Sequence, residues 1–570
     1  MKGISMEKGR KIVLLTLTAI AFAFALPLCF IGEARAQTQV TVDLTARRQI
    51  IHGFGGMDIT WNPNGLLSSA NRQLVFGNGP NQLGFTVLRV YLGENQTEWS
   101  RTVDNAKWAS DNGVLVFASP WHPPQSMRQT RDTTINGQRR TYYRLNPSSY
   151  TAYTNHINAY IEYMYSNGVN LYAVSIQNEP DYGINNYSDD GWCLWNQQEM
   201  VNFMRDHAGN IDPRVKVISP ETFQYEAWSG SNGQAKPLFT AMLNDAGARR
   251  NIDIFGTHFY GVHRPSLSDP SLPFQWSSFE AIGRPEGKEL WMTEVYTPDN
   301  RDGNIWNADS ASDAMRTARI IHYSKVAGGM STWVWWYIHR FYSVLHDGLG
   351  HPNTTPQGTN GQITKRGWIT AQYSKFIRPG FHRVETTPSR FGSNDDNRTF
   401  ISAYHGDNGA VVIVAVNMNS AAQSVNFSIS GATSGLSTME VWRTSGTENL
   451  AKQTNINVSG NAFSANLPGR SVTTFTGTAS TTTAVLYGNG SAAGASVPML
   501  TVRGRTLTVN ALDDSELNIR IVNLTGRTVA SFSANGRSNV SLRKLPAGSY
   551  IMEAKQVKSG AKMVSNIVLR

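Results

Sequence analysis

The chain has 570 residues, and its 51 Lys and Arg against 41 Asp and Glu give a formal net charge of +10. This charge is confined to the ends: residues 1–36 hold five basic and two acidic side chains, residues 498–570 hold eleven and four, and residues 37–497 are neutral. A neutral central region argues against nucleic-acid binding there, because contacts to phosphates require a basic surface.

Residues 1–36 have the pattern of a secretory signal peptide. A basic start is followed by an apolar run from Ile12 to Ile31 and by the small-residue site Ala34-Arg35-Ala36. The run is long enough for an uncleaved membrane anchor, but Pro27 interrupts it, so we expect cleavage and export. Cys193 would then be the single cysteine, which excludes an intrachain disulfide and predicts a buried apolar role for this residue.

Residues 51–379 alternate strand-like runs with longer helical or loop segments, as βα units do. Ser149–Ser166 has helical spacing of apolar residues. The pattern predicts an α/β fold, a (β/α)8 TIM barrel, whose parallel strands converge at one mouth. The eight strands are expected at Gly53–Ile59, Thr86–Leu92, Val114–Pro120, Tyr172–Glu179, Val215–Glu221, Ile252–Tyr260, Glu289–Tyr296 and Thr332–Ile338.

Residues 380–477 change to short alternating strands, which predict an antiparallel side β-sandwich. Residues 37–50, with the strand-like Gln39–Leu44, are expected to complete this sandwich. The later strands are expected at Thr399–Tyr404, Ala410–Asn417, Ser424–Ser430, Met439–Arg443, Ala462–Leu467 and Ser471–Thr476.

The uncharged, Thr-, Ser- and Gly-rich stretch Thr476–Ser496 predicts a flexible linker, placed at residues 478–498. Residues 499–570 then form a small C-terminal β-domain. Its strands are expected at Leu507–Ala511, Leu517–Asn523, Asn539–Leu542, Tyr550–Lys555 and Met563–Leu569.

Two acidic residues lie at the ends of predicted barrel strands. Glu179 is in Asn178-Glu179-Pro180 and Glu294 is in Thr293-Glu294-Val295-Tyr296. Each alone is better explained as a carboxylate that caps the next helix. Together at one barrel mouth they predict hydrolysis of a glycosidic bond with retention, with Glu179 as general acid and Glu294 as nucleophile.

Several neighbours are expected to support this pair. Asn178 can bind a sugar hydroxyl, and Tyr260 and Arg89 can keep Glu294 ionised. Glu221, which ends the predicted fifth strand, is a third carboxylate with a supporting role.

Aromatic residues at or beyond the predicted strand ends suggest a sugar-binding surface, although ordinary core packing is the alternative for each. The candidates are Trp61, Trp121, Trp336, Tyr182, Tyr296 and Tyr342. Arg340, after the eighth strand, could bind a carboxylate on the substrate, or it could form an internal salt bridge. The histidines do not have metal-ligand spacing, so no metal and no cofactor is expected; they are His52, His122, His258, His263 and His339.

With these residues in view, the chain from about Val40 to Gly477 resembles the glucuronoxylan endo-β-1,4-xylanases of glycoside hydrolase family 30, subfamily 8. The matching segments are Gly53-Phe54-Gly55-Gly56-Met57, Phe117-Ala118-Ser119-Pro120-Trp121, Val174-Ser175-Ile176-Gln177-Asn178-Glu179-Pro180-Asp181-Tyr182, Trp291-Met292-Thr293-Glu294-Val295-Tyr296 and Leu467-Pro468-Gly469-Arg470-Ser471-Val472-Thr473-Thr474-Phe475. The resemblance implies a barrel fused to a side β-sandwich and retaining hydrolysis of xylan.

Carried over by position, the resemblance makes Glu179 the acid/base and Glu294 the nucleophile. It assigns Trp336, Arg340, Tyr342 and Tyr260 to binding of the 4-O-methylglucuronic acid branch. The chain departs from its relatives at His122 and His339, where Asn and Arg are expected, and in Gly348–Gly361, which resembles an insertion. These departures bear on fine specificity.

The C-terminal block resembles the sorting domains of the type IX secretion route, which implies contact with secretion machinery. The alternative is adhesion of the basic tail to an anionic cell surface or acidic polysaccharide. We therefore expect an exported, monomeric, retaining endo-xylanase that acts on glucuronoxylan. The alternatives are a related β-glycanase that does not depend on the acidic branch, and a non-catalytic carbohydrate-binding or adhesion protein.

Overall fold

The computed structural model describes residues 37–59, 66–135, 138–182, 193–224, 235–260, 276–296, 311–350, 358–432 and 436–479, followed by 499–503, 506–510, 516–523, 527–534, 537–542, 544–546, 548–557 and 562–569. The expected signal peptide (1–36), Trp61, His263, residues 351–357 of the expected insertion and residues 480–498 of the expected linker lie outside these ranges.

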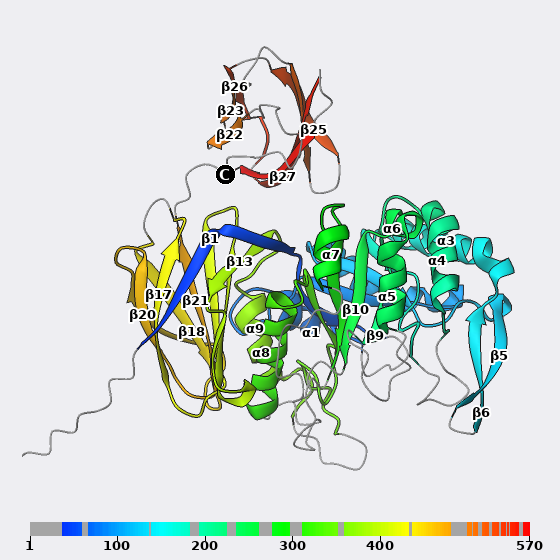
Figure 1. The fold of residues 1–570 in the computed structure, drawn as a ribbon, viewed down its shortest axis with the longest axis horizontal. Helices are drawn as coiled ribbons and strands as arrows, with labels where there is room; N and C mark the ends of the chain where they lie inside the picture. The colour runs from blue at the N-terminus through cyan, green and yellow to red at the C-terminus, as the bar shows by residue number, and fades with distance from the viewer. Residues whose placement is uncertain are drawn as a thin grey trace, which may run out of the picture. The chain divides into compact units, whose positions relative to one another are not determined.

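Eight parallel strand positions close into a barrel, which confirms the predicted fold (Figure 1). The ring closes where strand β10 (Ile254–Tyr260) pairs in parallel with strand β11 (Glu289–Val295). The strands are β2 (Gly53–Met57), β3 (Val87–Leu92), β4 (Leu115–Pro120), β7 (Leu171–Ser175), β8 (Lys216–Ile218), β10 (Ile254–Tyr260), β11 (Glu289–Val295) and β12 (Thr332–Tyr337).

Two predicted strands end earlier than expected, and in both the acidic residue at the predicted end lies outside the observed strand. The prediction Tyr172–Glu179 is wrong at its end, because β7 stops at Ser175 and Glu179 lies four residues beyond it. The prediction Val215–Glu221 is also wrong, because Glu221 lies between β8 and the separate strand β9 (Thr222–Gln224), which pairs with β10. Glu179 and Glu221 thus lie on irregular backbone beyond the strand ladders.

The helices surround the barrel strands in chain order. They are α1 (Ser69–Phe76), α2 (Ser100–Asp111), α3 (Tyr150–Ser166), α4 (Gln197–Asp206), α5 (Ala235–Asn244), α6 (Ala246–Arg250), α7 (Trp276–Ile282), α8 (Ala311–Val326) and α9 (Lys365–Ser374). Short 3-10 turns occur at η2 (Gln96–Glu98), η3 (Gln125–Met127), η4 (Pro147–Ser149), η5 (Ala208–Asn210) and η6 (Asp395–Asn397). Within the described ranges, none of the helices has the length and apolar character needed to cross a membrane.

Sequence spacing predicted α3 well, because its apolar residues recur on one face and are buried there; they include Tyr153, Ile157, Tyr160, Ile161 and Met164. A hairpin between β4 and α3 was not predicted. It consists of β5 (Arg128–Ile135) and β6 (Gln138–Leu145), whose charged and polar residues give no apolar alternation.

Seven of the eight barrel strands contribute an apolar side chain to one buried central cluster. Its members are Val87, Phe117, Ala173, Ile218, Ile254, Trp291 and Val334. The eighth strand, β2, places Gly55 in the ladder between Val87 and Val334. A Cβ atom at Gly55 would lie 1.8 Å from the backbone oxygen of Val87. Gly55 of the Gly53–Met57 motif is therefore required by the packing of the barrel interior.

A second, nearly closed sheet follows the barrel. It contains β1 (Thr38–Ile51), β13 (Phe381–Thr387), β14 (Arg390–Gly392), β15 (Arg398–His405), β16 (Ala410–Asn417), β17 (Gln423–Ser430), β18 (Thr438–Thr444), β19 (Ala451–Asn457), β20 (Ala462–Leu467) and β21 (Ser471–Thr478). The prediction of purely antiparallel pairing is wrong at β1, which pairs parallel with β17 and antiparallel with β13. Strand β21 reaches Thr478, so the expected linker Thr476–Ser496 is strand at its start.

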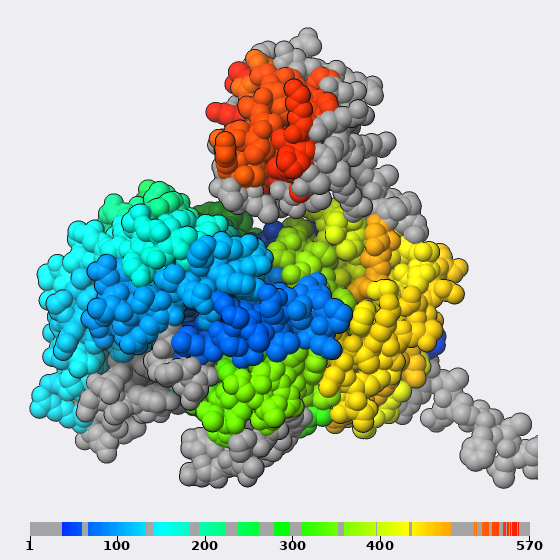
Figure 2. Space-filling view, turned by 180° about the vertical axis from the view of Figure 1, so that it is seen from behind, coloured from blue at the N-terminus to red at the C-terminus, as the bar shows by residue number. Residues whose placement is uncertain are grey.

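Specific hydrogen bonds join this sheet to the barrel unit. The Gln372 side chain of α9 donates to the Thr444 hydroxyl over 2.8 Å, and the Thr474 hydroxyl donates to the Gln372 carbonyl over 2.7 Å. Within the barrel, Lys375 donates to the carbonyl oxygens of Gly79 and Gln82. Figure 2 shows blue segments from early in the chain lying against green segments from much later in the chain.

The C-terminal residues form two small antiparallel sheets around their own apolar core. Strands β22 and β25 were not predicted. The sheets contain β22 (Met499–Arg503), β23 (Thr506–Asn510) and β26 (Arg537–Ser541), and β24 (Leu517–Asn523), β25 (Thr528–Ala534), β27 (Gly548–Gln556) and β28 (Lys562–Leu569).

Gly55→Ala should lower the free energy of unfolding by about 3 kcal/mol or more, because its methyl group would overlap rigid backbone. Urea unfolding followed by circular dichroism measures this change. Gly446→Ala is the matched control, since a Cβ atom there meets no atom within 4 Å. Equal stability of the two variants would contradict the packing argument.

Candidate active site

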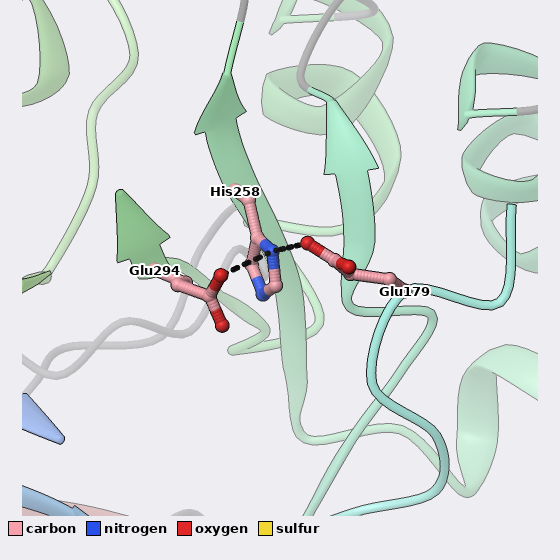
Figure 3. Close-up of side chains that lie close together, drawn as sticks. All are labelled: Glu179, His258 and Glu294. Atoms are coloured by element: carbon pink, nitrogen blue, oxygen red, sulfur yellow. Dashed lines mark hydrogen bonds and ion pairs between the residues drawn. The ribbon is translucent and has the colours of Figure 1, made fainter. Parts of the chain in front are cut away.

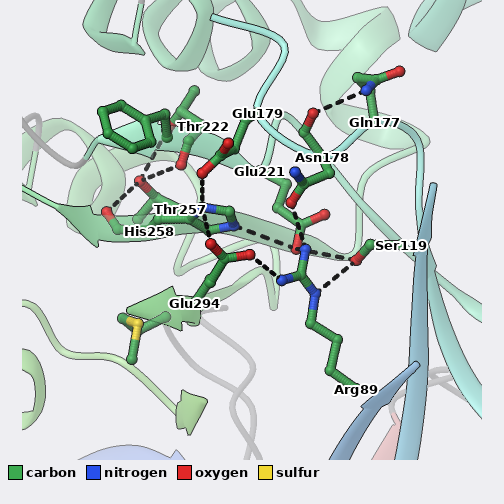
Figure 4. Close-up of polar contacts among 12 residues, drawn as sticks. Arg89, Ser119, Gln177, Asn178, Glu179, Glu221, Thr222, Thr257, His258 and Glu294 are labelled. Carbon is green, nitrogen blue, oxygen red and sulfur yellow. Dashed lines mark hydrogen bonds and ion pairs between the residues drawn. The ribbon is translucent and has the colours of Figure 1, made fainter. Parts of the chain in front are cut away.

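The predicted acidic residues come together at the carboxyl end of the barrel strands (Figure 4). Glu294 lies one residue before the end of β11, and Glu179 follows β7. Both are buried, with 4% of each residue exposed. Glu221, from the break between β8 and β9, is completely buried beside them.

Both irregular segments hold their glutamate in a left-handed backbone conformation. The φ angle is 48° at Glu179 and 50° at Glu221. Non-glycine residues rarely adopt this region, and such residues cluster at functional sites. The Glu179 amide donates to the Glu221 carbonyl over 3.0 Å, and the Asn178 amide donates to the Pro120 carbonyl over 2.8 Å. Three neighbouring strand ends therefore hold the Asn178-Glu179 segment in place.

The two proposed catalytic carboxylates face each other across a short gap. One oxygen of Glu179, one oxygen of Glu294 and a nitrogen of His258 all lie within 4.8 Å of one another (Figure 3). Retaining glycosidases hold their carboxyl groups about 5–5.5 Å apart, whereas inverting enzymes need about 6.5–9.5 Å to admit water. The separation fits attack by a carboxylate rather than by water.

Arg89, on β3, is the central cation of the site and is fully buried. Its guanidinium donates to Glu294, to Asn178 Oδ1 over 2.5 Å and to Ser119 Oγ over 3.1 Å. It also forms an ion pair with Glu221 at 3.1 Å. Burial alone would lower the pKa of Arg89, but the charges of Glu221 and Glu294 outweigh it and raise that pKa.

Glu294 accepts hydrogen bonds from two groups named by the sequence. Besides Arg89, the Tyr260 hydroxyl donates to Glu294 Oε1 over 2.7 Å. The pKa of Tyr260 is raised well above 10 by burial and by the Glu294 charge, so the phenol keeps its proton. These two donors hold the Glu294 carboxylate in a fixed position.

His258 is a site residue that the sequence analysis missed. Its Nδ1 lies 2.8 Å from Glu179 Oε1 and 3.8 Å from Glu294 Oε1. Burial alone would lower its pKa, but Glu294, Glu179 and Glu221 together raise the pKa of His258 to about 9. The available signal was its position two residues before Tyr260, because residues i and i+2 of a strand share a face.

Aromatic rings form a continuous row beside these carboxylates. The ring centroids are 5.4 Å apart for Tyr260 and Tyr296, 5.2 Å for Tyr296 and Tyr342, and 5.6 Å for Trp336 and Trp121. Tyr337, not predicted, links Tyr342 at 6.2 Å to Trp336 at 4.3 Å.

A second short stack reaches the other side of the same tyrosine. Tyr182 stacks on Phe223 at 3.9 Å, and Phe223 stacks on Tyr260 at 4.9 Å. Phe223 was not a candidate in the sequence. The structure thus brings together every predicted aromatic residue that it describes.

Arg340 lies three residues after β12, with a quarter of its side chain exposed. Within the described ranges, Arg340 pairs with Asp347 at the limiting ion-pair distance of 4.0 Å. Arg340 and Asp347 therefore form only a weak internal salt bridge, which was the alternative role for Arg340. His339, next to Arg340, is buried, and its Nε2 lies 3.0 Å from Asn360 Oδ1.

The cluster of Glu179, His258 and Glu294 has the donor types of a metal site. The chemistry of these donors favours proton transfer instead. A protonated His258 has no lone pair to offer a metal ion, and Arg89 already places a positive charge against Glu294. The expectation of no metal stays a prediction.

Cys193 is fully buried, which confirms its predicted packing role, and burial raises the pKa of its thiol to about 12.

Comparison with known proteins gives a consistent set of relatives. The chain is 42% identical over 446 residues to the glucuronoxylanase XynC of Bacillus subtilis, covering 78% of this chain and 93% of that protein. It resembles a family 30 endoxylanase structure from Clostridium papyrosolvens with a TM-score of 0.62 at 35% identity, covering 78% of this chain and all of that one. A family 30 subfamily 8 xylanase structure from Clostridium acetobutylicum gives a TM-score of 0.60 at 30% identity, covering 77% and 100%.

The terminal residues match a different family. Residues 504–570 match the secretion system C-terminal sorting domain.

Asp181, two residues after Glu179, should make stability depend on pH. Burial raises its pKa to about 7, so the folded state binds a proton that the unfolded state releases near pH 4. This contribution to stability is lost as the pH rises through 7. Asp181→Asn cannot ionise, so its free energy of unfolding relative to the native chain should increase by more than about 1 kcal/mol between pH 5 and pH 8.

Urea unfolding at each pH measures this difference. Asp111→Asn, at an exposed position on α2, is the control variant. A constant difference for Asp181→Asn would show that Asp181 is ionised in the folded protein.

Proposed function

The chain belongs to the glucuronoxylanases of glycoside hydrolase family 30, and we propose that it cleaves the xylan backbone of glucuronoxylan with retention of configuration. The observation that carries the reaction type is the opposed pair Glu179 and Glu294, with oxygens no more than 4.8 Å apart. Its C-terminal sorting domain marks it as an exported protein.

In the first step, Glu294 attacks the anomeric carbon of the xylose unit that precedes the cleaved bond. A covalent bond forms between the sugar and a Glu294 oxygen as the glycosidic C–O bond breaks. Glu179 gives its proton to the departing oxygen. Arg89 and Tyr260 keep Glu294 ionised and aligned before the attack.

In the second step, Glu179 acts as a base. Its carboxylate takes a proton from water, the water oxygen attacks the anomeric carbon, and the bond to Glu294 breaks. Because the carbon is attacked twice from opposite faces, the product keeps the configuration of the substrate. Asn178, held by Arg89, is placed to bind a hydroxyl of the reacting sugar.

Arg340 and its aromatic neighbours are proposed to bind the 4-O-methylglucuronic acid branch. A guanidinium can form paired, charge-assisted hydrogen bonds with a carboxylate. The partly exposed Arg340 and its long 4.0 Å contact with Asp347 support this role, because a guanidinium held this loosely can still pair with a substrate carboxylate. Trp336, Tyr342 and Tyr260 would hold the sugar ring of the branch.

The basic C-terminal domain is proposed to contact secretion machinery during export. Adhesion to an anionic surface remains the alternative role for this domain. The catalytic unit is proposed to act as a monomer.

Glu294→Gln should lower kcat on glucuronoxylan by about 10⁴-fold or more while leaving polysaccharide binding measurable, because the nucleophile is lost but the binding surface is retained. Reducing-sugar release and affinity electrophoresis provide the two measurements. Unchanged turnover would exclude Glu294 as the nucleophile. Loss of both turnover and polysaccharide binding in a folded variant would instead indicate that Glu294 binds the substrate.

Glu179→Ala is the companion variant and tests retention. It should keep the first step on an aryl xylobioside whose leaving group needs no proton, and added azide should give the β-configured glycosyl azide. Glu162→Gln, exposed on α3, is the control and should retain full activity.

Arg340→Ala should lower kcat/KM on glucuronoxylan by about 10- to 100-fold, because a charge-assisted contact of about 1.5–3 kcal/mol is removed. Activity on unsubstituted xylan should not change. Mass spectrometry should find the branch at a fixed distance from each new reducing end with the native enzyme, and at variable distances with the variant.

Arg47→Ala, in the side sheet, is the matched control. Branch placement that survives Arg340→Ala would favour the alternative, a related β-glycanase indifferent to the acidic group.

A further inference from the structure

Glu221 is a buried carboxylate that the proposed reaction does not use. It is completely buried, its Oε1 accepts a hydrogen bond from Ser119 Oγ over 3.1 Å, and the same oxygen lies 3.1 Å from the Arg89 guanidinium. Burial of a charge is costly unless other charges and donors compensate it, so the position of Glu221 calls for a physical explanation.

The surroundings of Glu221 connect it to both catalytic residues. Arg89 joins it to Glu294, and His258, whose Nε2 lies 3.8 Å from Glu221 Oε1, joins it to Glu179 (Figure 4). The backbone gives a third link, because the Glu221 carbonyl accepts the Glu179 amide. Glu221 itself reaches the reacting atoms only through these neighbours.

We propose that Glu221 is a positioning residue that keeps the charge of the catalytic network balanced, so that Glu179 holds its proton until the glycosidic bond breaks. This proposal rests on the function proposed above. It adds a residue whose role is to set the pH range in which Glu179 can act as an acid.

Counting the charges gives the reason. The proposed reaction starts with Glu179 protonated and Glu294 ionised. With Arg89 positive, Glu221 negative and His258 held positive by Glu294 and Glu221, the network of the free enzyme is then neutral. In the glycosyl-enzyme, Glu294 is an uncharged ester and Glu179 has given its proton away, so the network is again neutral. Without Glu221, both states would carry one extra positive charge.

An extra positive charge would favour loss of a proton from the site. Among the described residues, the titratable groups that face His258 are Glu179, Glu221, Glu294 and Tyr260, with Asp181 further away. Removing the charge of Glu221 should let either His258 or Glu179 lose its proton at a lower pH. Loss of the Glu179 proton at a lower pH moves the alkaline limb of the activity profile to lower pH, because Glu179 is the acid of the proposed reaction.

Glu221→Gln tests the proposal, because it keeps the size of the side chain and removes its charge. The alkaline limb of kcat/KM on glucuronoxylan should shift to lower pH by about one unit. The loss of rate should be smaller on an aryl xylobioside whose leaving group needs no proton. NMR titration of the His258 ring should show a lower pKa in the variant, and this reading needs no turnover.

The chain offers a matched control in Glu289, at the opposite end of β11. It too is held by a histidine and a cation, with His52 at 2.7 Å and Lys216 at 3.3 Å. Glu289→Gln removes a similar charge far from the reaction and should leave the pH profile unchanged. An unshifted profile and an unshifted His258 titration in folded Glu221→Gln, or the same shift in Glu289→Gln, would overturn the proposal.

Glu221→Asp provides a second test if Glu221→Gln does not fold. Its shorter side chain keeps the charge but withdraws it from His258, so the His258 pKa should fall by a smaller amount; no fall would overturn the proposal. Failure of the proposed function is distinguishable, because it would appear as an inactive native enzyme while the His258 titration could still respond to Glu221.

Discussion

The buried guanidinium of Arg89 is the interaction on which the site depends. Three carboxylates, Glu179, Glu221 and Glu294, lie close together in a region from which water is largely excluded. Like charges at such distances cannot all ionise unless positive charge is built in beside them. Arg89 supplies one positive charge from the middle of a barrel strand, where its side chain is fully buried. His258 supplies a second positive charge. The strand ends place Glu221, Glu294 and Asn178 in contact with this one cation.

Much of the fold was predictable from the sequence because apolar residues recur with the period of each element. The barrel strands, the buried face of α3 and most strands of the side sheet follow from this pattern. The hairpin β5–β6 did not, because its polar residues carry no such period. The parallel pairing of β1 with β17 could not be predicted either, because the residue pattern of a strand does not specify which strand it pairs with. The breaks after Ser175 and Ile218 depend on backbone conformations that the residues Glu179 and Glu221 do not normally favour.

For the site, the sequence identified the residues with distinctive chemistry at strand ends. Arg89 contacts Glu294 and Asn178, and Tyr260 contacts Glu294. Glu179 is connected to Glu294 through His258. His258 was passed over because the histidines were tested as a metal pattern along the chain rather than as partners across the barrel. The row of rings could be foreseen as a set, but its order could not, because neighbouring rings come from different strands.

Strand β1 has a consequence for how this exported protein acquires its structure. It lies in the middle of the side sheet, between β13 and β17, so residues near the amino terminus complete a sheet whose other members come after the barrel. Such long-range contacts form slowly, because a large loop of chain must close first. The sheet cannot close until nearly the whole catalytic unit has left the ribosome or the translocation channel. Until then, strand β1 lacks its partners β13 and β17, which are synthesised several hundred residues later.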